Sequence, residues 1–308
     1  MQRGPIQREQ TPLTQFFKNN PEREYSLIVP GGNHGDRLIY EGLNHELDRL
    51  DIQYESVQYR SGTLSNRIRR RINERIRDHN IDHIPFTVPQ LNDPDAIMIH
   101  GGANVNDLWP HSILILRTLL KRYSNTPIVV APQTYWFPIT DFEAVLEGTE
   151  QPVHLFARER YSKRLLSNYN LPKSVSVGLS PDTAFYHDPQ SLASKASSAR
   201  SNYTDKKPYD LVSFRDDKER LVSDAEVEKI VKRSENCIVE DASLSPTYED
   251  FIALVSSADR IYTDRLHVSI LGALFDKDTE VYAGSYFKTR GVYNYTLSNF
   301  SNISFNES

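Results

Sequence analysis

Short apolar runs alternate with longer amphipathic stretches from residue 25 onward, and this rhythm predicts the fold of the first half of the chain. The runs expected to form strands are Tyr25–Val29, Gln53–Val57, Ala96–His100, Ile128–Ala131, His154–Ala157 and Ser174–Val177. Helical periodicity lies between them, at Asp36–Leu50, Leu64–Asp78, Ser112–Tyr123 and Arg160–Tyr169. Strands that alternate with helices indicate a parallel sheet with right-handed crossovers.

The same rhythm restarts after a break in composition. Residues 190–207 are rich in Ser, Ala, Lys and Asn and poor in large apolar side chains, which is typical of a linker or a long surface loop. Beyond this segment we expect strands at Asp210–Phe214, Cys237–Glu240, Arg260–Thr263 and Glu280–Ala283. The helices expected between them are Asp224–Glu235, Thr247–Ser256 and Leu266–Phe275.

The pattern therefore predicts an α/β protein with two doubly wound Rossmann-like domains that face each other across a cleft. The N-terminal domain is expected at residues 25–189, the linker at 190–207 and the C-terminal domain at 208–308. Residues 1–24 are expected to form an N-terminal arm. The last helix packs either on the C-terminal domain or back on the N-terminal domain.

Composition narrows the class of protein. A chain of 308 residues suits two such domains, and a net charge of −5 argues against a nucleic-acid binder. The single cysteine, Cys237, excludes an intrachain disulfide, and the Cys/His clusters of structural zinc sites are absent, so no metal is expected. The polar N-terminus lacks a signal core, and no apolar run approaches the roughly 20 residues that cross a bilayer, which favours a cytoplasmic protein.

Two glycine turns follow predicted strands, where ligands of doubly wound folds bind. Backbone amides in such turns approach anions closely, so Gly32, Asn33, Gly101 and Gly102 are candidate ligand contacts. An aspartate follows each turn, and for both aspartates a helix cap and an acid/base role are alternatives: these are Asp36 and Asp107.

Cationic side chains follow three further strands. Arg158 stands at the end of the fifth strand, and Lys288 lies beyond the last one. Arg265 and His267 both lie at a junction between a strand and a helix, where a cation, a titratable imidazole and a helix N-terminus together form an anion site with a proton donor. The alternative is a helix cap with two exposed polar residues.

The order of these motifs resembles the polysaccharide pyruvyl transferase family over roughly residues 25–295. Thr263–His267 with its following apolar helix is similar to the family's C-terminal hallmark, and the turns at 32–36 and 100–104 resemble its two glycine turns. Residues 156–162, 179–185 and 285–288 resemble further blocks in the expected order. Ala103 departs from a glycine common in the family, and Phe275–Asp278 departs from a usual Gly-Lys-Pro; neither change removes a group with an assigned role.

The resemblance implies a two-lobed fold like that of GT-B glycosyltransferases and a transferase that uses phosphoenolpyruvate as co-substrate, with no other cofactor. The product implied is a pyruvate ketal on two hydroxyls of a hexose, in an exopolysaccharide, another glycan or a lipid-linked oligosaccharide. Arg158 and Arg265 would clamp the donor, with Lys288 and the two glycine turns adding contacts. His267 would contact phosphate or act as general acid, and Asp36 or Asp107 would act as base.

Two other readings stay open at this point. A nucleotide-sugar glycosyltransferase could use the same fold, although the second half shows no clear acidic pair to hold a ribose. A non-catalytic carbohydrate-binding member of the family is the other alternative. The basic stretch Arg67–Arg77 is either a solvated helix face or a contact for anionic headgroups, so attachment to the inner face of a membrane also stays open.

Overall fold

A computed structural model describes residues 6–59, 90–200, 203 and 208–307, which form two compact units. The N-terminal unit contains residues 9–31 and 43–182; the C-terminal unit contains residues 1–8, 32–42 and 183–308. Packing thus divides the chain at 182/183, whereas the sequence prediction placed the end of the first domain at 189. The segment 32–42, which carries the first glycine turn, packs with the C-terminal unit.

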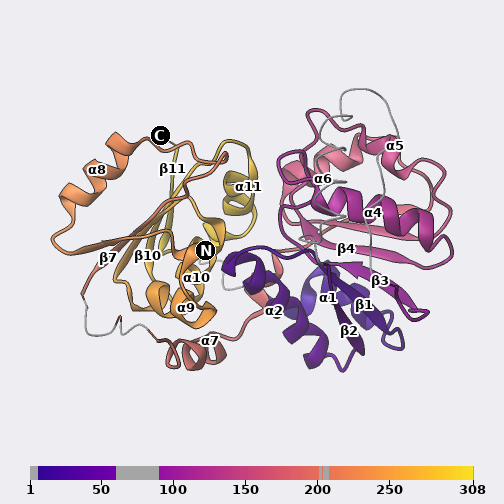
Figure 1. The fold of residues 1–308 in the computed structure, drawn as a ribbon, viewed down its shortest axis with the longest axis horizontal. Helices are drawn as coiled ribbons and strands as arrows, with labels where there is room; N and C mark the ends of the chain where they lie inside the picture. The colour runs from indigo at the N-terminus through magenta and orange to yellow at the C-terminus, as the bar shows by residue number, and fades with distance from the viewer. Residues whose placement is uncertain (1–5, 60–89, 201–202, 204–207, 308) are drawn as a thin grey trace. The chain divides into compact units, whose positions relative to one another are not determined.

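The N-terminal unit is built on a sheet of six parallel strands in the order β2-β1-β3-β4-β5-β6 (Figure 1). The strands are β1 (Tyr25–Val29), β2 (Tyr54–Gln58), β3 (Ala96–Ile99), β4 (Ile128–Gln133), β5 (Val153–Ala157) and β6 (Val175–Leu179). The helices are α1 (Pro12–Lys18), α2 (His34–Arg49), α4 (His111–Arg122), α5 (Phe142–Leu146) and α6 (Arg160–Ser167), and the first turns of α2 belong to the C-terminal unit.

The central strands of this sheet are apolar because both faces are covered. Every residue of β1, β3 and β4 is buried, so these strands read as continuous apolar runs rather than alternating ones. Their side chains pack with those of α4 and α5 in one core that includes Ile97, Leu116 and Phe142. The edge strand β2 is largely exposed or half-buried.

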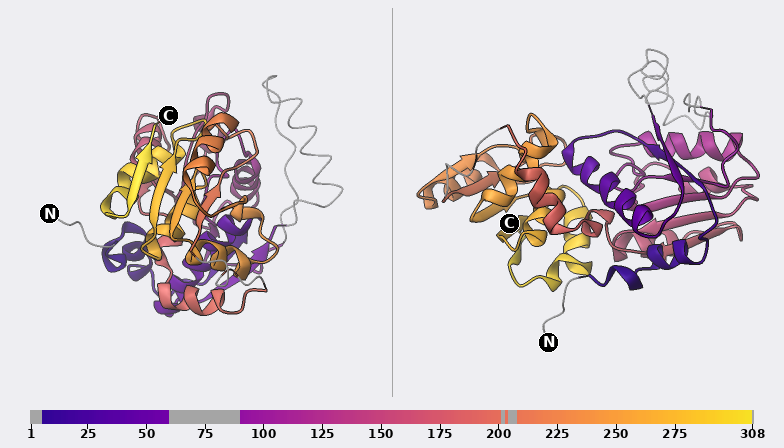
Figure 2. Two further views of the ribbon diagram at one scale, coloured as in Figure 1. Left: turned by 90° about the vertical axis from the view of Figure 1, so that its left-hand side faces the viewer. Right: turned by 90° about the horizontal axis from the view of Figure 1, so that it is seen from below.

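The C-terminal unit holds five parallel strands in the order β11-β10-β9-β7-β8. These are β7 (Asp210–Ser213), β8 (Cys237–Val239), β9 (Arg260–Thr263), β10 (Asp278–Tyr282) and β11 (Ile303–Asn306). Helix α8 (Asp224–Arg233) lies on one face, and α9 (Tyr248–Ser257) and α10 (Leu266–Leu274) pack together on the other (Figures 1 and 2). The remaining helices are α7 (Pro189–Ala196) and α11 (Lys288–Tyr295).

Both sheets have the same topology. In each, the first strand of the unit lies between the second and the third. The direction in which successive strands are added to the sheet therefore reverses at β1 and β3 in one unit and at β7 and β9 in the other, although all the strands are parallel. Doubly wound sheets bind their ligands beyond the carboxyl ends of the strands at such a switch point. The fold therefore directs attention to the residues that follow β7 and β9.

Two helices occupy segments expected to lack them. Helix α1 lies within the predicted arm and buries Leu13 and Phe17, and α7 lies largely within the predicted linker. Both begin with an acceptor side chain followed by proline: Thr11 caps α1, and Asp188 caps α7. Such an N-cap with proline at the first helical position is a start signal in itself.

Some sequence expectations fall outside the described residues, among them the helix Leu64–Asp78 and the basic stretch within it. Within the described part of the chain, none of the helices combines the length and apolar character needed to cross a bilayer. The same residues contain no group of three or more His, Cys, Asp or Glu side chains placed to hold a metal ion.

Candidate functional site

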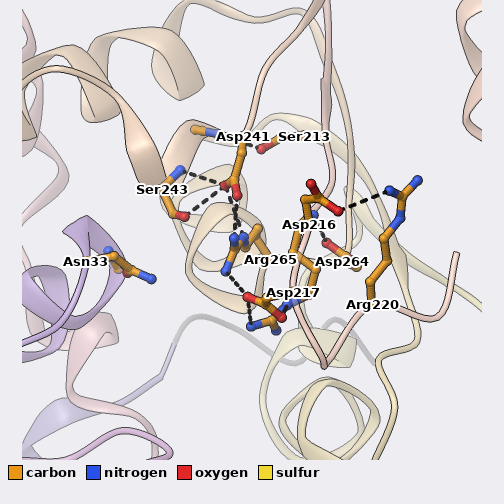
Figure 3. Close-up of polar contacts among 12 residues, drawn as sticks. Asn33, Ser213, Asp216, Asp217, Arg220, Asp241, Ser243, Asp264 and Arg265 are labelled. Carbon is orange, nitrogen blue, oxygen red and sulfur yellow. Dashed lines mark hydrogen bonds and ion pairs between the residues drawn. The ribbon is translucent and has the colours of Figure 1, made fainter. Parts of the chain in front are cut away.

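Charged side chains gather where the strands of the C-terminal sheet end (Figure 3). Three are cations, Arg215 after β7, Arg265 after β9 and Lys288 at the start of α11. Four are carboxylates: Asp217, Glu219, Asp241 and Asp264. We call these seven residues the strand-end cluster. It lies at the β7/β9 switch point, where the topology predicts a ligand site.

Arg265 lies between two carboxylates (Figure 3). Its Nε donates to Oδ1 of Asp241 at 3.0 Å, and its Nη2 also donates to Asp241. Its Nη1 lies 3.4 Å from Oδ2 of Asp217, a longer contact. Asp241 is in turn held by the backbone and hydroxyl of Ser243. The guanidinium is thereby fixed at the N-terminus of α10, of which Arg265 is the N-cap residue.

Arg215 forms a second, more enclosed set of ion pairs. Its Nε and Nη2 donate to Asp217 at 2.7 and 2.9 Å, and its Nη1 donates to Glu219 at 2.8 Å. Glu219 also accepts a hydrogen bond from the ammonium of Lys288. Burial alone would lower the pKa of Arg215, but the neighbouring carboxylates outweigh it and raise that pKa. The cation is therefore permanent at any physiological pH.

Asp264 is the most deeply buried carboxyl of the strand-end cluster and has no exposed surface. Its Oδ1 accepts a hydrogen bond from the backbone N–H of Arg215 at 2.9 Å, whereas its Oδ2 has no hydrogen-bond partner among the described residues. Burial raises the pKa of Asp264 to about 6, against the opposing attraction of Arg215, Arg265 and Lys288. A proton can thus reside on this carboxyl near neutral pH.

The first glycine turn caps α2. Oδ1 of Asn33 accepts from the N–H of Gly35 at 2.8 Å, and Oδ2 of Asp36 accepts from the N–H of Asn33 at 2.9 Å, which is a reciprocal capping box. Gly32 has φ +142°, and a Cβ there would lie 2.0 Å from Oδ2 of Asp36. The turn thus supports the capping alternative for Asp36, and its role as base stays a prediction.

His267 packs against this same turn. A Cβ on Gly35 would lie 2.6 Å from Nδ1 of His267, so only glycine lets α2 approach the ring this closely. Next to it, Nε2 of His34 donates to the backbone oxygen of Ser245 at 2.7 Å. The first turn of α2 and the start of α10 therefore meet inside the C-terminal unit, with the imidazole of His267 at their contact.

Arg158 lies in the N-terminal unit and is fully buried. Its Nη1 donates to Oδ2 of Asp182 at 2.6 Å, and its Nε donates to the hydroxyl of Thr134 at 2.9 Å. Since the side chain has no exposed surface, contact with a donor would require it to leave Asp182. Its role as a donor clamp stays a prediction.

Asp107 also has a structural role. Its carboxylate accepts from the backbone N–H groups of Ile139 and Thr140, at 2.7 and 3.0 Å, and from the hydroxyl of Thr140. These contacts hold the loop that follows β4. These contacts support a structural role for Asp107, similar to the helix cap that was the alternative to acid/base chemistry. Its role as base stays a prediction.

The second glycine turn, at the end of β3, is joined to the end of β4. The N–H of Gly102 donates to Pro132 and its carbonyl accepts from Thr134, both at 3.0 Å, at a backbone φ of +133°. The ring of His100, the residue before Gly101, has no exposed surface, and burial lowers its pKa to about 3. This histidine is a neutral residue of the core.

Comparison with known proteins identifies the family. A sequence model of the family "Polysaccharide pyruvyl transferase" matches residues 33–279, which include the first glycine turn from Asn33 onward, the second glycine turn, and the strand-end cluster except Lys288. The chain belongs to the polysaccharide pyruvyl transferase family. This confirms the family resemblance inferred from the motifs.

One curated relative carries a name from this family, and solved structures show a similar fold. The chain is 24% identical over 234 residues to a Bacillus subtilis (strain 168) protein named "Putative pyruvyl transferase EpsO", covering 68% of this chain and 71% of that one. A crystal structure of an uncharacterized Klebsiella pneumoniae protein aligns with a TM-score of 0.63 at 20% identity, over 96% of this chain and 97% of that one. A UDP-N-acetylglucosamine 2-epimerase structure from Listeria monocytogenes aligns at 12% identity with a TM-score of 0.48, over 87% and 81%.

In this member of the family the predicted site residues divide between the two units. The C-terminal unit contains Arg265, His267, Lys288, Gly32, Asn33 and Asp36; the N-terminal unit contains Arg158, Asp107, Gly101 and Gly102. The sequence prediction omitted Arg215 and the four carboxylates of the strand-end cluster. For Arg215 a signal existed, since it follows a predicted strand, but a surface charge run was the alternative before the pairing with Asp217 and Glu219 was known.

Proposed function

We propose that this chain transfers the enolpyruvyl group of phosphoenolpyruvate to two hydroxyls of a hexose in a glycan, forming a pyruvate ketal and inorganic phosphate. The observation that carries the proposal is the strand-end cluster, where Arg215, Arg265 and Lys288 converge beside His267 at the β7/β9 switch point. A donor with one carboxylate and one phosphate needs several cations, and planar arginine forks suit both groups.

The reaction needs one proton donor and one proton acceptor. Protonation of C3 of the enolpyruvyl group generates a cationic centre at C2, which a first sugar hydroxyl attacks as it loses its proton. Phosphate then leaves with one proton, and the second hydroxyl attacks C2 to close the ketal. Two hydroxyl protons are lost, one proton is gained at carbon and one departs with phosphate, so the protons balance.

His267 is the residue that we assign to proton donation or to the phosphate. It follows Arg265 by two residues at the start of α10, and the glycine at position 35 leaves its ring room beside the capping turn of α2. An imidazole next to a helix N-terminus and two guanidinium groups suits transfer of a proton to or from a phosphate oxygen.

The test is release of inorganic phosphate from phosphoenolpyruvate in the presence of hexose-containing glycans, with ketal formation followed by NMR. We expect acceptor-dependent release, and we expect His267→Asn to lower kcat about 10²- to 10⁴-fold. His45→Asn is the control, because His45 lies on α2 well beyond its first turn. Turnover of UDP-sugars without turnover of phosphoenolpyruvate would contradict the proposal and favour a glycosyltransferase.

A further inference from the structure

The strand-end cluster holds more negative than positive charge. Among the described ion pairs of the cluster, four carboxylates lie against three cations: Asp217, Glu219, Asp241 and Asp264 against Arg215, Arg265 and Lys288. An anionic donor would meet no net positive charge there, although anion sites in proteins rely on a local excess of cations and N–H groups. We therefore expect at least one carboxylate to move away from the cations when an anion binds.

Asp217 is the carboxylate placed to give way. Its Oδ2 bridges the two arginines, at 2.9 Å from Nη2 of Arg215 and 3.4 Å from Nη1 of Arg265 (Figure 3). A carboxylate held by two guanidinium forks has the geometry that a bound carboxylate or phosphate adopts. The side chain of Asp217 thus occupies the position between the arginines that an anionic ligand would occupy.

The other carboxylates are less exposed than Asp217, which also accepts the backbone N–H of Glu219 at 2.9 Å. The Asp241 side chain is 13% exposed and accepts from Arg265 and Ser243, and Glu219 is 3% exposed between Arg215 and Lys288. The Asp217 side chain is 28% exposed, and its contact with Arg265 is the longest ion pair in the cluster. Water can therefore solvate Asp217 as it leaves, which lowers the cost of the exchange.

We propose that Asp217 is an internal competitor for the donor: it neutralises Arg215 and Arg265 while the site is empty and leaves Arg265 when the anionic donor binds. The inference rests on the proposed function, because it concerns the affinity of the same site for phosphoenolpyruvate. It makes Asp217 a residue that weakens donor binding, whereas Arg215 and Arg265 strengthen it.

The test compares Asp217→Asn with a neighbouring charge. Asp216→Asn removes the same charge one residue away, but the Asp216 side chain is 99% exposed and its ion pair is with Arg220 at 3.9 Å (Figure 3). Isothermal titration with phosphoenolpyruvate should show Asp217→Asn binding about fivefold more tightly than the wild type, and Asp216→Asn within about twofold of it. The Asp216 control removes the effect of net charge alone.

The outcomes are distinct. Equal or weaker binding by Asp217→Asn overturns the inference, since Asp217 would then only position Arg215; the proposed function survives because the wild type still binds. No binding by the folded wild type and by the folded Asp217→Asn variant overturns the proposed function and the inference together. If Asp217→Asn does not fold, as judged by circular dichroism, Asp217→Ser decides the question with the same titration.

Discussion

Two arginines, the buried Arg158 and the partly exposed Arg265, follow parallel strands in the two units, but their surroundings differ. Arg158 faces Asp182 and Thr134 and is sealed from solvent. The Arg265 side chain retains 11% of its surface and is shared between a firmly held carboxylate and a more exposed one. From this difference we expect a strand-end arginine to have a structural role when its partners enclose it, and a binding role when one of its partners can be exchanged.

The largest effect that would test this comparison is on stability. Replacing Arg158 with Met leaves the carboxylate of Asp182 buried without its cation, because neither side chain is exposed. We expect the free energy of unfolding to fall by about 3–5 kcal/mol, measured by urea denaturation. Arg160→Met is the matched control at an exposed position and should cost less than about 0.5 kcal/mol.

A second substitution separates a structural pair from a donor clamp. If Arg158 acts through Asp182, Asp182→Asn in the Arg158→Met background removes the uncompensated charge and restores part of the lost stability. A stable Arg158→Met variant that has lost affinity for phosphoenolpyruvate would reverse our comparison and return Arg158 to the donor clamp that the motifs predicted.

The next effect is on activity. Arg265→Ala should lower kcat/KM about 10²- to 10³-fold, since it removes a charged donor from a partly enclosed anion site. Its stability cost should be smaller than that of Arg158→Met, because Asp217 reaches solvent and Asp241 keeps the hydrogen bonds from Ser243. The measurement is steady-state phosphate release alongside urea denaturation.

Arg260 supplies the control for this variant. Arg260 is the first residue of β9, at the end of the strand opposite to Arg265. Its side chain is 52% exposed and pairs with Asp278 at 2.9 Å. Arg260→Ala should leave kcat/KM within about twofold of the wild type. An equal loss in both variants would mean that the strand-end cluster is not the donor site.

The elements of the fold were largely readable from the sequence, and the reason is their burial. β1 and β9 have the predicted bounds, because every residue of β1 and three of the four residues of β9 are buried, and buried strands are rich in apolar residues. Helix α11 was missed: its sequence carries Gly291, two β-branched residues and two aromatics, which weakens any helical pattern. Tertiary packing around buried Val292 overrides that propensity.

The site was less readable, because its contacts join distant parts of the chain. Arg265 and Asp241 are 24 residues apart, as are Arg158 and Asp182, and no local spacing reveals either pair. The motif pattern therefore predicted Arg265, His267 and Lys288 as site residues, and this stays a prediction, but it could not tell that Arg158 is enclosed. It also could not show that Asn33 and Asp36 satisfy one another in a capping box.

The smallest expected effect is on the pH dependence of stability, and it concerns Asp264. In the N-terminal unit, Arg158 pairs with a single carboxylate, that of Asp182. The strand-end cluster instead has one more carboxylate than cations. Among its carboxylates, the buried Asp264 is the one whose pKa rises, from an ordinary 3.8 to about 6. The folded state then binds a proton more tightly than the unfolded state between these values. Asp264 thus destabilises the fold progressively as pH rises from about 4 to 6.

Asp264→Asn makes this visible, since the amide has nearly the same shape and cannot ionise. At pH 4 the variant and the wild type should have similar free energies of unfolding; by pH 7 the variant should gain about 3 kcal/mol relative to the wild type. The pKa of Asp217 shifts in the opposite direction: Arg215 and Arg265 lower it to about 2, against the effect of burial. Asp217 therefore changes its charge below pH 4 and does not affect the comparison between pH 4 and pH 7. A difference that is independent of pH would mean that Asp264 is ionised throughout, and that the cations of the strand-end cluster outweigh its burial.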